Sequence, residues 1–143
     1  GVTGTAAANA MAAEADVVLA VGTRLQDFTT GSWALFANPE CRIVGLNVQA
    51  FDAGKHRGQP LVCDARAGLA ELTAALGDHA APAAWTAKAE AARTDWLATA
   101  ARHTDASNAA LPSDAQVVGS VQRWSKPSDV VLCAAGGLPG ELH

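Results

Sequence analysis

Residues 15–33 read ADVVLAVGTRLQDFTTGSW, and this stretch decides the fold. It opens with a short apolar run at residues 17–21, which is rich in valine and far too short to cross a membrane. Such a run is typical of a strand that is buried on both faces of a parallel sheet. In these sheets, ligands bind at the loops that follow the carboxyl ends of the strands. We therefore expect the polar loop at residues 23–32 to face a ligand.

The composition excludes several classes of function. The net charge is -4 and the ten lysines and arginines are scattered, so no basic surface is expected to bind nucleic acid. No segment has the length of a membrane-spanning helix, and the first residues lack the pattern of a signal peptide. The three cysteines lie far apart, which fits neither a zinc site nor a disulfide framework. We expect a cytoplasmic protein with reduced thiols and no nucleic-acid or membrane partner.

The N-terminal half alternates between helix and strand patterns. Residues 5–14 are nearly all alanine, the best helix former, and Thr3 or Thr5 can cap this helix. Runs of β-branched and other apolar residues predict strands at residues 42–48 and 61–63. This alternation predicts an α/β fold with a parallel sheet.

Two further helices follow the last of these strands. Asp64 can cap the first, whose three leucines lie on one stripe before Gly77 ends it. Residues 85–102 then have the pattern of a long helix, with Trp85 and Trp96 on one face. A pair of tryptophans on such a face indicates packing against a neighbouring domain.

The last part of the chain opens with a linker up to Pro112. Ser113 and Gln116 form an S-x-x-Q capping box before another helix. A strand is expected at residues 129–135, and the glycine-rich turn at residues 136–140 follows it. A turn of this kind, between a strand and a helix, lets the backbone approach a phosphate closely, although it can also be only a tight turn.

Four segments resemble thiamine diphosphate enzymes of the acetolactate synthase type. The strand at residues 17–21 and the TTG loop identify only this superfamily, whereas all four segments in order resemble its ring hydrolases of inositol catabolism. The segments are GVTGTAAAN at 1–9, VGTRLQDFTTGSW at 21–33, GLNVQAFDAGKH at 45–56 and AAGGLPGELH at 134–143.

The resemblance implies a division of the chain into three parts. Residues 1–80 correspond to a partial central domain, with a Rossmann-like parallel sheet flanked by helices and incomplete at both ends. Residues 81–112 correspond to a connecting helix and linker, and residues 113–143 to the start of the diphosphate-binding domain. In the family, the activating glutamate and the magnesium motif lie outside these segments, so this chain alone is expected to be catalytically inert.

The resemblance also implies two sets of cofactor-binding residues. The glycine turn would contact thiamine diphosphate through Gly136, Gly137, Leu138 and His143, the last either as a phosphate donor or only as a surface residue. The loop after the first strand matches the FAD-contacting loop of flavin-containing relatives at Arg24, Asp27, Thr30 and Gly31. Because Gln26 and residues 45–47 depart from the flavin pattern, we favour a loop that binds no FAD. It is then either a vestigial nucleotide site or a loop that Arg24 and Asp27 fix against a neighbouring domain or subunit.

The function implied is that of a hydrolase that uses thiamine diphosphate and Mg²⁺ to cleave a ring C–C bond of a cyclic dione. The resemblance further implies a homo-oligomer, because the superfamily builds its active sites between two subunits. Two alternatives remain open at this point: a ligase of the acetolactate synthase type, and a nucleotide-binding Rossmann-like module without catalysis. Against the second, the sequence has no G-x-G-x-x-G fingerprint. The residues themselves indicate no catalytic triad and no metal-ligand spacing.

Overall fold

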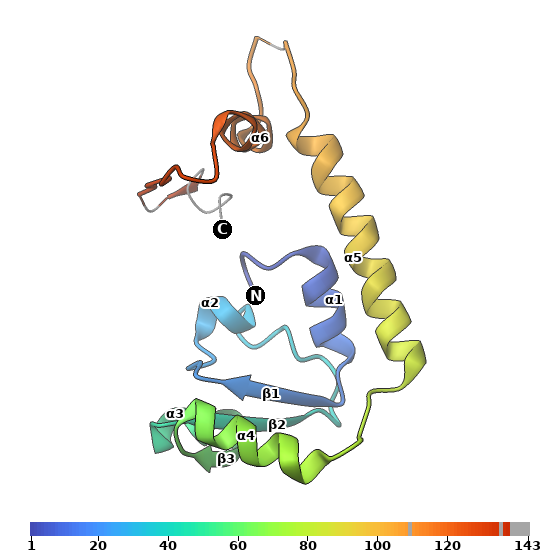
Figure 1. Cartoon of the computed structure of the whole chain (residues 1–143), viewed down its shortest axis with the longest axis vertical. Coiled ribbons are helices and arrows are strands. Elements are labelled where there is room, and N and C mark those ends of the chain that lie inside the picture. The colour runs from blue at the N-terminus through green and yellow to red at the C-terminus, as the bar shows by residue number, and fades with distance from the viewer. Residues whose placement is uncertain (109, 135, 138–143) are drawn as a thin grey trace. The chain divides into compact units, whose positions relative to one another are not determined.

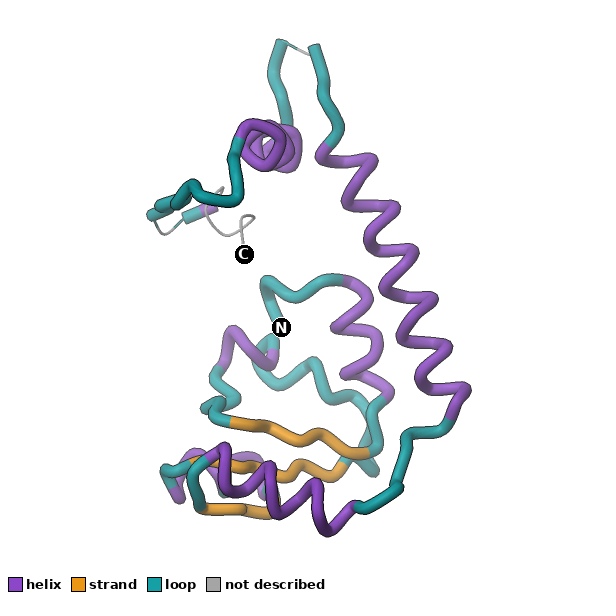
Figure 2. The backbone as a smooth tube through the Cα atoms, in the orientation of Figure 1, coloured by secondary structure: helices purple, strands orange, loops and turns teal. Residues whose placement is uncertain are grey.

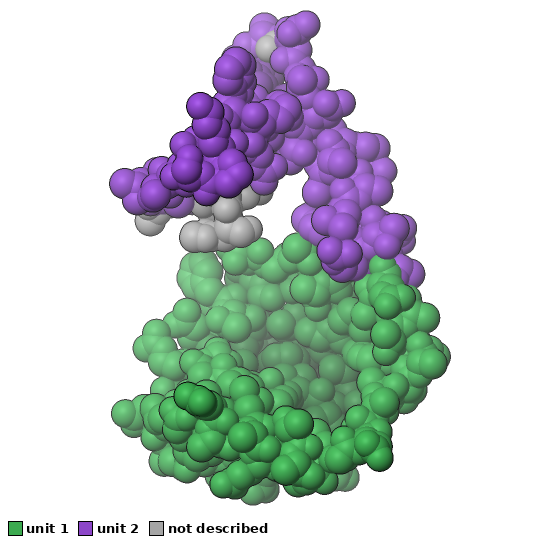
Figure 3. Space-filling model, in the orientation of Figure 1, with its two compact units in different colours: residues 1–90 green, residues 91–143 purple. Residues whose placement is uncertain are grey.

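A computed structural model describes residues 1–108, 110–134 and 136–137. The chain divides into two compact units, residues 1–90 and residues 91–143 (Figure 3). Figure 1 labels the elements, which are α1 (Ala6–Glu14), β1 (Val17–Val21), α2 (Asp27–Thr30), β2 (Arg42–Asn47), α3 (Ala50–Ala53), the 3-10 helix η1 (Lys55–Arg57), β3 (Gln59–Val62), α4 (Ala65–Leu76), α5 (Ala83–Thr104) and α6 (Asp114–Trp124).

The first unit contains a parallel sheet of three strands in the order β1-β2-β3. Figure 2 shows these strands side by side. Val18 pairs with Ile43 and Ala20 with Gly45, so the crossover through α2 returns the chain in register beside β1. The predicted α/β fold with a parallel, Rossmann-like sheet is confirmed.

The core lies against the central strand β2. On one face of the sheet, Ala20, Leu25 and Ile43 form a buried cluster. On the other face, Leu46 is fully buried, and α4 comes so close that a Cβ on Gly68 would lie 2.7 Å from the Leu46 Cδ1 atom. A small residue in α4 therefore lets this helix cover the centre of the sheet.

The prediction that β1 is buried on both faces is wrong. Val17, Leu19 and Val21 are exposed, Val17 by 56%. These side chains share a face with Leu46, because Val21 is paired with it in the register. Since β1 is an edge strand and α4 packs over β2, that face of β1 has no helix over it in the described part of the chain.

The caps predicted for three helices are confirmed. The Thr5 hydroxyl accepts from the Ala8 amide at 3.0 Å at the start of α1. The Asp64 carboxylate accepts from two amides at the start of α4, and Ser113 and Gln116 form the reciprocal capping box of α6. These side chains satisfy amides that the first turn of a helix leaves without partners.

Removing the Asp64 cap tests the role of this carboxylate. Asp64 Oδ1 accepts from the Arg66 amide at 2.9 Å and from the Ala67 amide at 3.1 Å. We expect Asp64→Ala to lower the free energy of unfolding by about 1 kcal/mol, and Asp64→Asn to retain most of the stability because an amide oxygen also caps. Urea unfolding followed by circular dichroism measures both. Equal losses in the two variants would contradict a capping role.

In the second unit, the C-terminal end of α5 packs closely against α6. A Cβ on Gly119 would lie 1.9 Å from the Thr104 carbonyl oxygen, so only glycine permits this approach. The same oxygen accepts a hydrogen bond from the Arg123 guanidinium at 2.6 Å. Two independent contacts therefore join these helices at Thr104.

The strand predicted at residues 129–135 is not formed in the structure. Residues 129–134 are irregular, residue 135 lies outside the described part, and Val130 and Leu132 are exposed. A strand needs a neighbour to satisfy its backbone groups, and the described residues of this unit supply none.

Candidate functional site

The loop after β1 begins at the carboxyl edge of the sheet with Gly22. This glycine has a φ of 63°, and in the described part of the chain no atom beyond its two chain neighbours lies within 4 Å of the position that its Cβ would occupy. The Gly22 amide still donates to the Leu46 carbonyl at 2.9 Å, so the loop starts in register with β2. The chain therefore leaves the sheet through a tight turn whose outer side is open.

Side chains from the next crossover hold this loop. Three consecutive carbonyl oxygens of the loop each accept a hydrogen bond: Thr23 O from Asn47 Nδ2 at 3.2 Å, Arg24 O from Lys55 Nζ at 3.2 Å, and Leu25 O from His56 Nε2 at 3.1 Å. The last bond requires the ring proton on Nε2. Asp52 in turn forms a 2.7 Å ion pair with Lys55. This three-point clamp fixes the backbone of residues 23–25 and leaves the Arg24 side chain exposed.

The structure uses the four residues predicted for this loop in different ways. Thr30 is buried, and its hydroxyl donates to the Gln26 carbonyl and accepts from the Trp33 amide, both at 3.1 Å. Gly31 ends α2 in the left-handed conformation. Arg24 and Asp27 remain exposed, with the Arg24 guanidinium 3.0 Å from Gln26 Oε1.

These placements bear on whether a flavin nucleotide would fit the loop. The Thr30 hydroxyl is already bonded to the Gln26 carbonyl and the Trp33 amide, so it is not free for a diphosphate. The exposed Arg24 guanidinium and the open side of Gly22 could both face an anion. The loop thus offers one exposed cation, Arg24, while the Thr30 hydroxyl is already bonded. That the loop binds no FAD stays a prediction.

The clamp residues were not among the sites predicted from the sequence. Asn47, Lys55 and His56 lie 24 to 31 positions from the carbonyls that they bind. All three fall within the segment GLNVQAFDAGKH at residues 45–56. The family resemblance of that segment was therefore the only sequence signal for these three residues, because no local pattern indicates that they contact the loop after β1.

The second predicted site is the glycine turn near the C-terminus. Gly136 has a φ of 140°, a conformation that favours glycine, and among the described residues no atom lies within 4 Å of the Cβ position of Gly137. This open backbone fits close approach by a phosphate. Leu138 and His143, the other two predicted residues, lie outside the described part of the chain.

The described residues contain no group of three or more His, Cys, Asp or Glu side chains that could hold a metal ion. Their helices include none long and apolar enough to span a membrane.

Cys41 and Cys133 differ in environment. Burial, together with the nearby Asp16 carboxylate, raises the pKa of the Cys41 thiol, whereas Cys133 is exposed. Because the thiolate is the reactive form, we expect iodoacetamide at pH 8 to modify Cys133 several-fold faster than Cys41. Cys41 alkylation should accelerate further as the pH rises past 9. Timed alkylation with mass spectrometry measures both rates, and unfolding in urea should equalise them; equal rates in the folded chain would contradict this difference.

Comparison with known proteins gives one family and a consistent group of relatives. Residues 1–72 match the model of the thiamine pyrophosphate enzyme central domain. The whole chain aligns with proteins named 3D-(3,5/4)-trihydroxycyclohexane-1,2-dione hydrolase: it is 36% identical to that of Geobacillus thermodenitrificans, over 25% of that protein, and 30% identical to that of Clostridium perfringens, over 26%. Another protein of this name, from Bacillus cereus, is 32% identical over 26% of its length.

The chain spans about a quarter of the length of these relatives. No solved structure matches it. The family match covers β1, β2, β3 and the loop that follows β1, so the sheet and the loop described above are those of the matched domain. The chain therefore belongs to the thiamine pyrophosphate enzymes, through their central domain.

Proposed function

We propose that this chain is an internal segment of a thiamine-diphosphate-dependent hydrolase that cleaves a ring C–C bond of trihydroxycyclohexane-1,2-dione, giving 5-deoxy-glucuronate in myo-inositol catabolism. The observation that carries the proposal is the alignment of the whole chain with relatives of that name at 30–36% identity. By itself the chain is inert, because the family's activating glutamate and magnesium motif are not among its segments. The intact enzyme is a cytoplasmic homo-oligomer.

The division into domains is part of the same proposal. Residues 1–80 form the central domain, residues 81–112 the connecting helix and linker, and residues 113–143 the start of the diphosphate-binding domain. The family match to residues 1–72 supports the first assignment, and the start of α5 at Ala83 supports the second. The capping box at Ser113 begins a new helix in the third part.

Thiamine diphosphate, when bound, supplies a carbanion nucleophile and an electron sink for C–C cleavage, with Mg²⁺ on its diphosphate. In this chain, Gly136 and Gly137 would contact the diphosphate through their backbone amides, together with Leu138 and His143. The φ of Gly136 and the open space beside Gly137 support this role, since neither position has a Cβ to hold a phosphate away. Substitution by a larger residue would exclude the phosphate from the turn.

The loop after β1 has a supporting role in this proposal. Arg24, Asp27, Thr30 and Gly31 form a vestigial nucleotide surface or a docking surface for a neighbouring domain. The clamp on residues 23–25 supports a fixed surface, because it removes freedom from the backbone beneath Arg24. FAD is not expected there, since the Thr30 hydroxyl is bonded to the backbone of Gln26 and Trp33.

Cofactor dependence of the protein that contains this sequence tests the proposal. The protein is stripped of cofactor, and consumption of the dione is followed after adding thiamine diphosphate and Mg²⁺ together or singly. We expect consumption only with both. Gly137→Val should raise the thiamine diphosphate concentration needed for half-maximal rate, while Gly54→Ala, at a glycine far from the turn in sequence where a Cβ fits, should leave it unchanged. Consumption without thiamine diphosphate would overturn the proposal.

Calorimetry of the 143-residue chain with FAD distinguishes the proposed hydrolase segment from a nucleotide-binding module without catalysis. A nucleotide-binding module predicts saturable binding that weakens in Arg24→Gln. The proposed hydrolase segment predicts no heat of binding from FAD. Saturable FAD binding that depends on Arg24 would therefore favour the module.

A further inference from the structure

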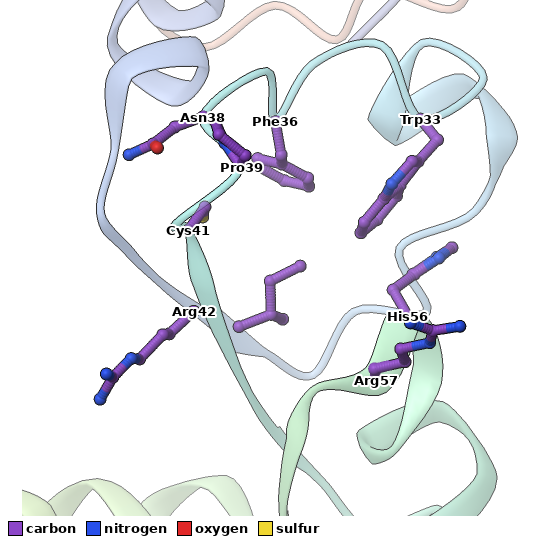
Figure 4. A pocket seen from close by; sticks show the side chains of 9 residues that line it. Trp33, Phe36, Asn38, Pro39, Cys41, Arg42, His56 and Arg57 are labelled. Carbon is purple, nitrogen blue, oxygen red and sulfur yellow. The ribbon is translucent and has the colours of Figure 1, made fainter.

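A cavity of about 370 Å³ lies in the first unit, beside the start of β2. Its lining comes from the loop between α2 and β2, from η1 and from the start of β2, which includes Ile43. Figure 4 shows the labelled side chains around it. The cavity is thus built from segments far apart in sequence. It shares no lining residue with the four residues predicted for the loop or with the glycine turn.

The inner wall of the cavity is aromatic. Trp33 and Phe36 meet edge to face, with ring centroids 5.4 Å apart and planes at 71°. Figure 4 shows both rings directed into the cavity. The His56 ring stacks on Trp33 at 3.7 Å and 18°, which holds the indole in place. A flat apolar group would find two rings at an angle to pack against, as aromatic groups prefer.

Two arginines, Arg42 and Arg57, are among the residues that line the cavity, and no aspartate or glutamate is. The nearest acid named by the structure is Asp16, whose carboxylate acts on the lining residue Cys41. Within the described part of the chain, the structure gives neither guanidinium a hydrogen bond or an ion pair. Figure 4 shows both side chains pointing away from the Trp33 and Phe36 rings. Both side chains are exposed and long enough to reorient toward an anion at the mouth.

The backbone around the cavity is strained. Trp33, His56 and Arg57 have φ values of 70°, 58° and 59°, a region that non-glycine residues seldom occupy. Each such residue costs of order 1–3 kcal/mol and persists only where the surrounding structure requires it. Here the strain places the stacked rings and one arginine around the same cavity.

We propose that this cavity binds a small planar aromatic carboxylate. The ring would lie between Trp33, Phe36 and Ile43, and the carboxylate would remain at the mouth, where Arg57 and Arg42 can donate hydrogen bonds to it. A cavity of this size that combines aromatic rings with a few polar groups is typical of small-ligand sites. The proposal does not depend on the hydrolase assignment, in which His56 is the one cavity residue with a part, through its hydrogen bond to the Leu25 carbonyl.

Titration of the 143-residue chain with 2-naphthoate tests the site, with 2-naphthamide as an uncharged probe of the same shape. The indole N–H signals of the four tryptophans are followed by NMR, and Trp33→Phe assigns the signal of Trp33. We expect 2-naphthoate to shift the Trp33 signal saturably and to leave those of Trp85, Trp96 and Trp124 in place. The amide should bind more weakly.

Charge variants locate the carboxylate. Arg57→Gln and Arg42→Gln should each raise the Kd of 2-naphthoate by about twofold to fivefold, as expected for an exposed ion pair. Neither should change the Kd of 2-naphthamide. Arg66→Gln, at an exposed arginine of α4 outside the cavity, is the matched control and should change neither. Equal affinity for the two probes, no effect of either cavity arginine, or no shift of the Trp33 signal would each overturn the proposal.

Discussion

Gly45→Ala is expected to lower the free energy of unfolding of the first unit by about 3 kcal/mol. A Cβ at this position of β2 would lie 2.2 Å from the Ala53 carbonyl oxygen and 2.9 Å from its carbonyl carbon. Both are backbone atoms of α3, so they cannot turn aside as the end of a side chain could. The substitution must push α3 away from the sheet, and with it Lys55 and His56, which hold the loop after β1.

Gly54→Ala is the matched control for this variant. Gly54 ends the same helix with a φ of -91°, and its Cβ would lie 3.5 Å from the nearest atom, the Ala50 carbonyl oxygen. Alanine therefore fits, and we expect a change of less than about 0.5 kcal/mol. Urea unfolding of both variants gives the two free energies. A Gly45→Ala chain as stable as Gly54→Ala would show that α3 does not pack on β2 as described.

Leu46→Ala is expected to cost about 2–5 kcal/mol, because it opens a cavity at the most buried side chain of the sheet. Leu46 is 0% exposed and lies beneath α4, where Gly68 allows the helix to approach. The substitution removes the side chain beyond Cβ and leaves a cavity. The backbones of β2 and α4 are held by their own hydrogen bonds, so they cannot move together to fill it.

Leu76→Ala deletes the same atoms from the last turn of α4, where the side chain is 49% exposed. Much of that surface is already in water, so we expect a loss of less than about 1 kcal/mol. Urea unfolding gives both losses. The slopes of the free energy of unfolding against urea concentration show whether both variants unfold in the same transition. Similar losses for the two leucines would contradict the position of α4 over β2.

Local sequence patterns were sufficient for most of the elements. β-branched runs predicted β1 and β2, and short polar side chains at Thr5, Asp64 and Ser113 predicted the starts of α1, α4 and α6. These features depend on neighbours within a few residues, so the sequence carries them directly.

Features that depend on distant residues could not be predicted in this way. The exposure of Val17 follows from the place of β1 at the sheet edge, which an apolar run does not reveal. The apolar run at residues 129–134 has strand composition, but a strand forms only where another is present to pair with it. At the site, the clamp on residues 23–25 and the stack of Trp33 on His56 join segments more than 20 residues apart.

The most direct test of the central claim is the ratio of kcat/KM for trihydroxycyclohexane-1,2-dione to that for pyruvate, measured on the protein that contains this sequence, with thiamine diphosphate and Mg²⁺. A hydrolase of the proposed kind should turn over the dione to an open-chain acid and leave pyruvate unchanged. Formation of acetolactate from pyruvate, with the dione untouched, would contradict the account and assign the chain to a ligase of the same family.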